Sequence, residues 1–228
     1  MHSLLPEAPL EGGLLGRVQY WFACFFVVGW TGLVCAGLFG QFGLGEVPCR
    51  LCLVQRMFMV LAALGACHVI RTALRYGAVT GRDYMTGWGL ALVAATGGSF
   101  ASWRQAAPHI LPGAKGHGGE VAGLHPSVWA LVLFQLSVVA IGVVLAFAHA
   151  TADRAIPASG PGPYRAVGLF ALWFLGAAVA LSLAAVFLEQ GFHWFLPEDP
   201  GRYEFFHDLG VLDEPAASGA PTPGPARS

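Results

Sequence analysis

Residues 18–45, VQYWFACFFVVGWTGLVCAGLFGQFGLG, contain no Asp, Glu, Lys or Arg. A helix needs about 20 consecutive apolar residues to cross a membrane, because the hydrocarbon core of a bilayer is about 30 Å thick. Further uncharged runs occupy residues 84–103, 121–152 and 166–188. This pattern excludes an ordinary soluble domain and predicts an all-α, polytopic membrane helical bundle.

The overall composition agrees with a membrane protein. Of the 228 residues, 56% are hydrophobic and only 11% are charged, and the formal net charge is −1. Binding to nucleic acid depends on clustered Lys and Arg that neutralise phosphates. Because the chain has no basic block, the sequence excludes nucleic acid as a partner.

Five membrane helices are predicted, at about residues 18–41, 52–71, 84–103, 127–149 and 165–189. The second is the shortest apolar segment, since Arg56 and Arg71 flank residues 57–70. It spans a bilayer only if one charge lies at each edge. The odd number of helices places the two ends of the chain on opposite sides of the membrane. The first helix is expected to remain in the mature protein and not to be cleaved as a signal peptide, because Glu7 and Glu11 precede it where a signal peptide has basic residues.

Basic residues near the helix ends favour a cytoplasmic N-terminus, because cytoplasmic loops are enriched in Lys and Arg. The difference between the two sides is small, and charge alone leaves the opposite orientation open. The N-terminal side has Arg17, Arg71, Arg75, Arg82, Arg154 and Arg165, whereas the other side has Arg50, Arg56, Arg104, Lys115 and Arg202.

The C-terminal tail has two parts. Residues 192–212 mix aromatic with acidic side chains, a composition that suits the membrane interface. From about residue 215 the chain is mainly Pro, Ala, Gly and Ser. Such a segment cannot bury a core, so it is predicted to be disordered.

Two of the five cysteines form a Cys-x-x-Cys motif, Cys49-Arg50-Leu51-Cys52, just before the second helix. A neighbouring Arg or a helix N-terminus favours the reactive thiolate in such pairs. Arg56 follows Cys52 by four residues, so a cation is expected on the same helical face as the sulfur. Redox exchange is therefore predicted for this pair. Cys24, Cys35 and Cys67 fall within apolar segments and are expected to be small core residues.

Two other roles for the pair stay open. A zinc site needs two more ligands; the loop histidines His109, His117 and His125 are the candidates, but no second Cys pair exists. No metal site is predicted. A purely structural disulfide is the other alternative, although closing so short a loop contributes little stability.

The segment Pro48-Cys49-Arg50-Leu51-Cys52-Leu53-Val54-Gln55-Arg56 resembles the signature of the disulfide bond formation protein B (DsbB) family. The resemblance covers roughly residues 18–149 and implies a four-helix membrane bundle. A cytoplasmic segment, 1–17, precedes this bundle. A linker and the additional fifth membrane helix follow it in residues 150–189, and a non-cytoplasmic tail, 190–228, ends the chain. The resemblance implies an inner-membrane enzyme with the Cys pair on the periplasmic side.

By this resemblance, the chain passes electrons from a periplasmic thioredoxin-like dithiol protein, similar to DsbA, to a membrane quinone, either ubiquinone or menaquinone. Cys49 would exchange disulfides with the partner, and Cys52 would face the quinone. Arg56 would bind a quinone oxygen, with Gln55 and Arg104 as further quinone-binding residues. Gln105 stands where the family more often has a His.

One departure from the family affects the mechanism. The loop between Arg104 and Pro126 contains no cysteine, whereas the family usually has a second pair there that receives electrons from the partner. Either the partner reaches Cys49 directly, a second protein supplies the pair, or the donor is different. The alternative function is a non-enzymatic membrane subunit with a static disulfide or a metal-binding Cys pair. A transporter is disfavoured, because no acidic residue lies in the middle of a helix.

Overall fold

A computed structural model describes residues 13–43, 50–107, 126–190 and 205 of the chain. These residues form an all-α bundle with five long helices and one short one. The bounds are α1 Leu14–Gly43, α2 Arg50–Tyr76, α3 Gly81–Ala106, α4 Pro126–Ala146, α5 Ala148–Thr151 and α6 Pro163–Gln190. The interfacial segment and the disordered tail that the sequence predicts lie outside the described residues, as do Cys49 and the loop histidines.

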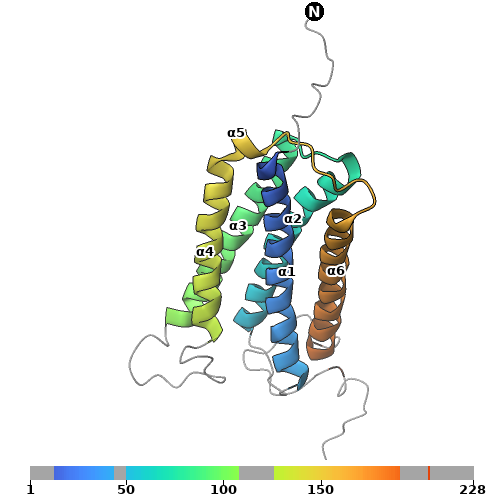
Figure 1. Ribbon diagram of the computed structural model, residues 1–228. Helices are drawn as coiled ribbons and strands as arrows, with labels where there is room; N and C mark the ends of the chain where they lie inside the picture. Colours follow the sequence, from blue (N-terminus) through green and yellow to red (C-terminus); the bar gives the residue numbers. More distant parts are fainter. Residues whose placement is uncertain (1–12, 44–49, 108–125, 191–204, 206–228) are drawn as a thin grey trace, which may run out of the picture.

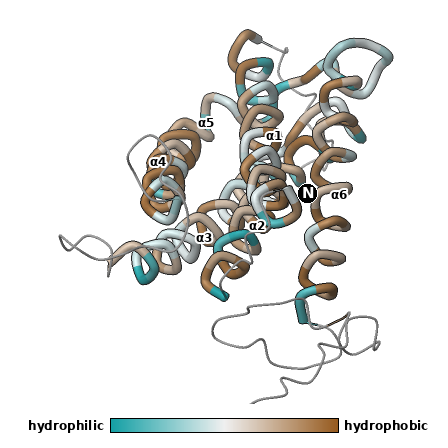
Figure 2. The backbone as a smooth tube through the Cα atoms, turned by 90° about the horizontal axis from the view of Figure 1, so that it is seen from below, coloured by the Kyte–Doolittle hydropathy of each residue, from teal (hydrophilic) through white to brown (hydrophobic). Residues whose placement is uncertain are grey.

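The long helices run in alternating directions (Figure 1). As a result, the start of α2 and the ends of α1, α3 and α6 lie together at the lower end of the view. We call this the redox end, because Cys52 of the pair predicted to exchange electrons lies there, at the start of α2. Figure 2 looks at the bundle from below and shows hydrophobic colours along most of α4 and α6, as expected for helices that face lipid, whereas α3 is paler.

Within the described ranges, four helices are long and apolar enough to cross a membrane, namely α1, α2, α4 and α6. The segment at 52–71, which the sequence marked as marginal, is therefore a candidate span. Helix α3 is long but falls outside this set, because glycine, serine and threonine lower its hydropathy. Its position explains the composition: α3 packs against both α2 and α4, so small residues serve helix contact there.

The backbones of α2 and α3 approach each other most closely at Gly65 and Gly87. A Cβ atom at Gly65 would lie 2.6 Å from the carbonyl oxygen of Gly87 and from the amide nitrogen of Ala91. Since real Cβ atoms do not come so close, this crossing needs glycine. The contact brings the two helices together and so determines the distance between side chains at the redox end.

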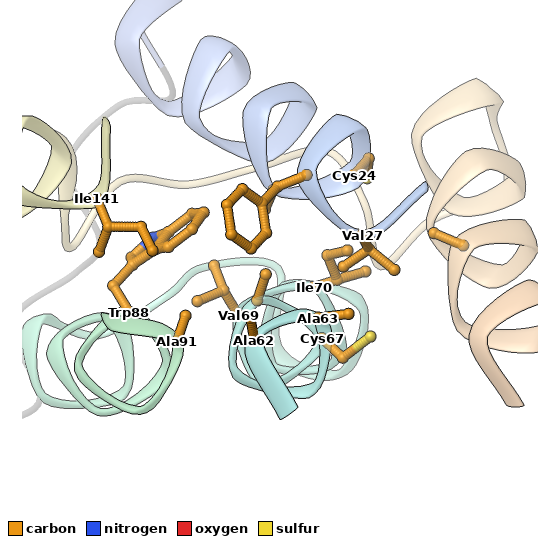
Figure 3. Close-up of a cluster of buried hydrophobic side chains, with 14 of the residues drawn as sticks. Cys24, Val27, Ala62, Ala63, Cys67, Val69, Ile70, Trp88, Ala91 and Ile141 are labelled. Carbon is orange, nitrogen blue, oxygen red and sulfur yellow. The ribbon is translucent and has the colours of Figure 1, made fainter. Parts of the chain in front are cut away.

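Aromatic and small side chains fill the centre of the bundle. The rings of Trp30 and Phe134 stack at 4.6 Å between centroids, and Phe26 meets Trp88 edge-on at 5.5 Å. Figure 3 shows further core side chains from α1 to α4 around this region. Cys24 and Cys67 are both buried among them, as the sequence predicts.

The predicted fourth helix, 127–149, is divided. Helix α4 ends at Ala146, and α5 begins at Ala148 after a non-helical Phe147. The Thr151 hydroxyl of α5 contacts the Tyr84 hydroxyl of α3 at 3.4 Å, and the Asp153 carboxylate accepts a hydrogen bond from the Gly81 amide at 2.8 Å. These contacts with the start of α3 accompany the bend of the chain towards α6, so the prediction of one continuous helix was wrong.

Helix α6 lies beside α1 and α2 (Figures 1 and 2). Ala178 and Ala185 pack against Val34 and Leu38 of α1. The opposite face of α6 exposes large apolar side chains to the surroundings, including Phe170, Trp173, Leu181, Leu183 and Phe187. The additional helix thus has one face in the bundle and one face suited to lipid.

Candidate active site at the redox end

Cys52 lies in the first turn of α2 and is half-buried. Its predicted partner, Cys49, lies outside the described residues. A side chain in the first turn of a helix is close to unpaired backbone N–H groups and the positive end of the helix dipole. This position favours negative charge on the Cys52 sulfur.

The last turn of α3 contributes a donor to the same sulfur. Gln105 Nε2 donates a hydrogen bond to Cys52 Sγ over 3.2 Å. The sequence suggested Arg104 as the functional residue of this segment, but the structure exposes the Arg104 side chain. Ser102 and Gln105, three residues apart, share the α3 face that packs on α2, whereas Trp103 and Arg104 point outward.

Arg56 is a buried cation one turn above Cys52. The residue is only 8% exposed, and its guanidinium NH1 donates to Gln41 Oε1 of α1 at 3.1 Å. The charges of Arg56 and Cys52 act on each other, as the four-residue spacing predicts. A Cβ at Gly37 would lie 3.3 Å from Arg56 NH2, so the small residue on α1 leaves space for the guanidinium.

Gln55 joins α2 to α3 beside this group. Its Nε2 donates to Ser102 Oγ at 3.1 Å, and both side chains are buried. Of the predicted site residues that the structure describes, Gln55 and Arg56 are buried and Cys52 is half-buried at the start of α2, whereas Arg104 at the end of α3 is exposed.

The sequence interpretation missed Glu189. This residue of α6 is completely buried, and the charges of Arg56 and Cys52 are the ones that act on its carboxylate. A signal for it exists in the sequence: Ala171, Leu175, Ala178 and Ala185 follow one another at spacings of four, three and seven residues, which keep them on one helical face, and Glu189 continues that series. Gln41 and Gln105 were likewise not assigned a role.

Metal binding has no support in the described part of the chain, where no three His, Cys, Asp or Glu side chains form a group that could hold an ion. The loop histidines that a zinc site would need, His109, His117 and His125, lie outside the described residues.

Comparison with known proteins places the chain in a family. The family model described as "Disulfide bond formation protein DsbB" matches residues 19–160, more than half of the chain. Neither the curated proteins nor the solved structures that were compared with the chain gave a match. The matched region contains the Cys-x-x-Cys motif, Arg56 and Gln105. The chain therefore belongs to the DsbB family, and its general character is that of a multi-pass membrane disulfide oxidoreductase.

Proposed function

We propose that the protein is a thiol:quinone oxidoreductase that takes electrons from a periplasmic dithiol protein through Cys49 and Cys52. The observation that carries this proposal is the buried guanidinium of Arg56, one helical turn from Cys52 and held by Gln41. A structural disulfide needs no cation at this place. A redox site that develops negative charge on an acceptor oxygen does need one.

The residues at the redox end suit a quinone. Arg56 has five N–H donors, of which the structure pairs one with Gln41, so donors remain for a quinone oxygen. The apolar side chains Val34, Leu38 and Ala185 form a cluster between α1 and α6, with Met59 of α2 packed against it. A quinone requires this combination of a polar contact for its oxygens and apolar surface for its ring and tail. A bound quinone would accept two electrons and two protons.

On the thiol side, the steps follow disulfide exchange chemistry. A thiolate of the partner attacks the Cys49 sulfur, a mixed disulfide forms, and Cys52 leaves as a thiolate. The second partner thiol then attacks the mixed disulfide, which releases the oxidised partner and reduced Cys49. The N–H of Gln105 stabilises the Cys52 thiolate, and the guanidinium of Arg56, which keeps its proton, balances its charge.

The absent second cysteine pair gives this proposal a specific form. Because residues 105–125 contain no cysteine, we propose that the partner dithiol reaches Cys49 directly, unless a second protein supplies the pair. Arg104, exposed at the end of α3, remains a predicted quinone contact.

The test is quinone reduction by the purified full-length protein in detergent, with a reduced thioredoxin-like dithiol as donor. Cys52→Ser is expected to abolish turnover, because no disulfide can form with Cys49. Arg56→Gln is expected to lower the rate about a hundredfold, the usual effect of removing one electrostatic contact to a developing negative charge.

Two variants serve as controls. Cys67→Ala removes a buried thiol elsewhere on α2, and Arg71→Gln removes an exposed cation towards the other end of that helix. Both are expected to keep wild-type turnover. If Arg56→Gln reduces quinone as fast as Arg71→Gln, the proposed role of the cation is wrong. If neither the wild type nor any variant reduces quinone with any dithiol donor, the protein is better described as a non-enzymatic membrane subunit.

A further inference from the structure

Glu189 is a titratable group for which the proposed mechanism has no use. Its side chain is 0% exposed, and among the described residues neither of its carboxylate oxygens has a hydrogen-bond partner. An ionised carboxylate buried without partners is costly unless an opposite charge compensates it. The position of Glu189 therefore requires either a nearby cation or a proton on the carboxyl group.

The packing of α6 directs Glu189 into the bundle. Ala178 and Ala185 are buried against Val34 and Leu38 of α1, and Glu189 follows Ala185 by four residues, on the same face of the helix. The carboxyl group consequently lies towards the helices of the redox end and away from the lipid-facing side of α6.

Among the described residues, the groups that act electrostatically on Glu189 lie on α2. On α2 these are Arg56 and Cys52, whose charges both act on the carboxylate. On α1, Cys35 packs against the cluster that contains Ala185, and Gln41 is neutral. On α3, Gln105 at Cys52 is also neutral, and Arg104 is exposed.

One buried cation is thus shared by two groups that can become anions. If Cys52 were a thiolate while Glu189 was ionised, two negative charges would face Arg56 in a region of low dielectric. Such an arrangement is unfavourable, because like charges in a buried site disfavour simultaneous ionisation. When Cys52 is in a disulfide, however, it bears no charge, and an ionised Glu189 can balance Arg56.

We propose that Glu189 is a proton carrier of the redox site, ionised when Cys49 and Cys52 form a disulfide and protonated when Cys52 is a thiolate. This inference rests on the proposed function and assigns a role to the additional helix α6. Arg56 is then the counter-ion of Glu189 in the disulfide state and of the Cys52 thiolate in the reduced state.

The atoms and electrons balance in both halves of the cycle. The partner dithiol donates two electrons and two protons; the disulfide opens, one proton goes to the Cys49 thiol and the other to the Glu189 carboxylate. On re-oxidation the Cys49–Cys52 bond forms again, and two electrons leave for the quinone. The two protons that accompany them come from the Cys49 thiol and the Glu189 carboxyl, as many as a two-electron, two-proton acceptor such as a quinone would require.

The experiment is a redox equilibrium of the full-length protein in detergent with reduced and oxidised glutathione, without quinone and without oxygen. Alkylation followed by mass spectrometry measures the reduced fraction of the Cys49–Cys52 pair between pH 6 and pH 7.5. Glutathione thiols stay protonated in this range, because free thiols have a pKa of about 8.5. The pH dependence of the equilibrium constant therefore counts the protons that the protein takes up.

In the wild type, reduction of the Cys49–Cys52 pair takes up two protons, the same number that two glutathione thiols release when they are oxidised. The equilibrium constant is therefore expected to be independent of pH. In Glu189→Gln only Cys49 takes up a proton, and the constant is expected to shift towards the reduced pair about tenfold for each pH unit of increase. Glu189→Leu removes the carboxyl with a different side chain and is expected to give the same tenfold dependence. Ser182→Ala, on α6 one heptad before Glu189, is the matched control and should behave as the wild type does.

The inference is overturned if the wild type and both Glu189 variants show the same pH dependence, or if the wild-type constant itself rises tenfold per pH unit. Thermal unfolding in detergent shows that each variant is folded. A failure of the proposed function has a different signature: the wild-type pair would not exchange with glutathione, or would exchange without reducing quinone.

Discussion

At the scale of single residues, three other helices contribute a polar side chain to the group around Cys52 and Arg56 of α2. Gln105 of α3 donates to the sulfur directly, whereas Gln41 of α1 acts through Arg56. Glu189 of α6 acts on both charges. A hydrogen bond to a charged group contributes about 1.5–3 kcal/mol, so the amide of Gln105 has a measurable effect on the thiolate.

Replacing Gln105 by Leu should make Cys52 less reactive. Without the N–H donor, the fraction of thiolate falls, and the rate of Cys52 alkylation at pH 7 is expected to drop about tenfold, which corresponds to about 1.4 kcal/mol. The measurement is the rate of iodoacetamide labelling in a Cys49→Ala background, followed by mass spectrometry of the Cys52 peptide.

Ser99→Ala provides the control for this prediction. Ser99 is a buried residue on the same helix, and its hydroxyl donates to the Ala95 carbonyl of its own helix. Its loss should leave the labelling rate unchanged. Equal labelling rates in Gln105→Leu and wild type would mean that the hydrogen bond does not stabilise the thiolate.

At the scale of helices, the α2–α3 crossing controls the geometry of the site. Gln55 and Ser102, and also Cys52 and Gln105, form pairs across these two helices. The pairs depend on the close approach at Gly65 and Gly87, where added Cβ atoms would meet backbone atoms that cannot move independently.

Gly65→Ala is therefore expected to lower the stability of the bundle by about 1–3 kcal/mol, the usual cost of overpacking. Gly89→Ala is the matched control, because a Cβ there meets nothing within 4 Å. It should leave stability unchanged or raise it by up to about 1 kcal/mol, since alanine restricts the unfolded chain more than glycine does. Thermal unfolding of both variants in the same detergent measures the difference, and equal melting temperatures would show that the crossing tolerates a methyl group.

At the scale of the whole molecule, the alternating directions of the long helices (Figure 1) place the start of α2 and the ends of α3 and α6 at the same end of the bundle. The linker between α5 and α6 lies at the other end, where Ala155 pairs with Ala78 after α2. If the chain is oriented as the sequence predicts, the redox end faces the periplasm and this linker faces the cytoplasm.

Labelling of single cysteines in intact cells can measure this orientation. Gly118 comes in the chain between the end of α3 and the start of α4, which both lie at the lower end of the bundle in Figure 1, and Gly160 lies in the exposed linker; each is replaced by Cys. In a background without the native cysteines, a maleimide that does not cross membranes should label position 118 from outside. Position 160 should react only after permeabilisation. The reverse pattern would place the Cys pair in the cytoplasm, against the proposed function.

The sequence by itself determined the class of the fold and the relative placement of the residues proposed for the chemistry, Cys52 and Arg56. Long uncharged runs require helices in lipid, because no other element of a single segment satisfies its backbone hydrogen bonds there. The four-residue spacing of Cys52 and Arg56 places both on one helical face whatever the neighbouring helices do. Such features are local, so they can be derived without knowledge of the packing.

Only the tertiary structure decided which residues of other helices reach this centre. Gln105 rather than Arg104 contacts Cys52, because the rotation of α3 about its axis depends on its contact with α2. The break after Ala146 accompanies contacts with the start of α3. Glu189 lies more than a hundred residues from Arg56 in the chain, and the packing of α6 against α1 brings the two charges together. Contacts between distant segments follow from how the helices pack, and the pattern within one helix does not contain that information.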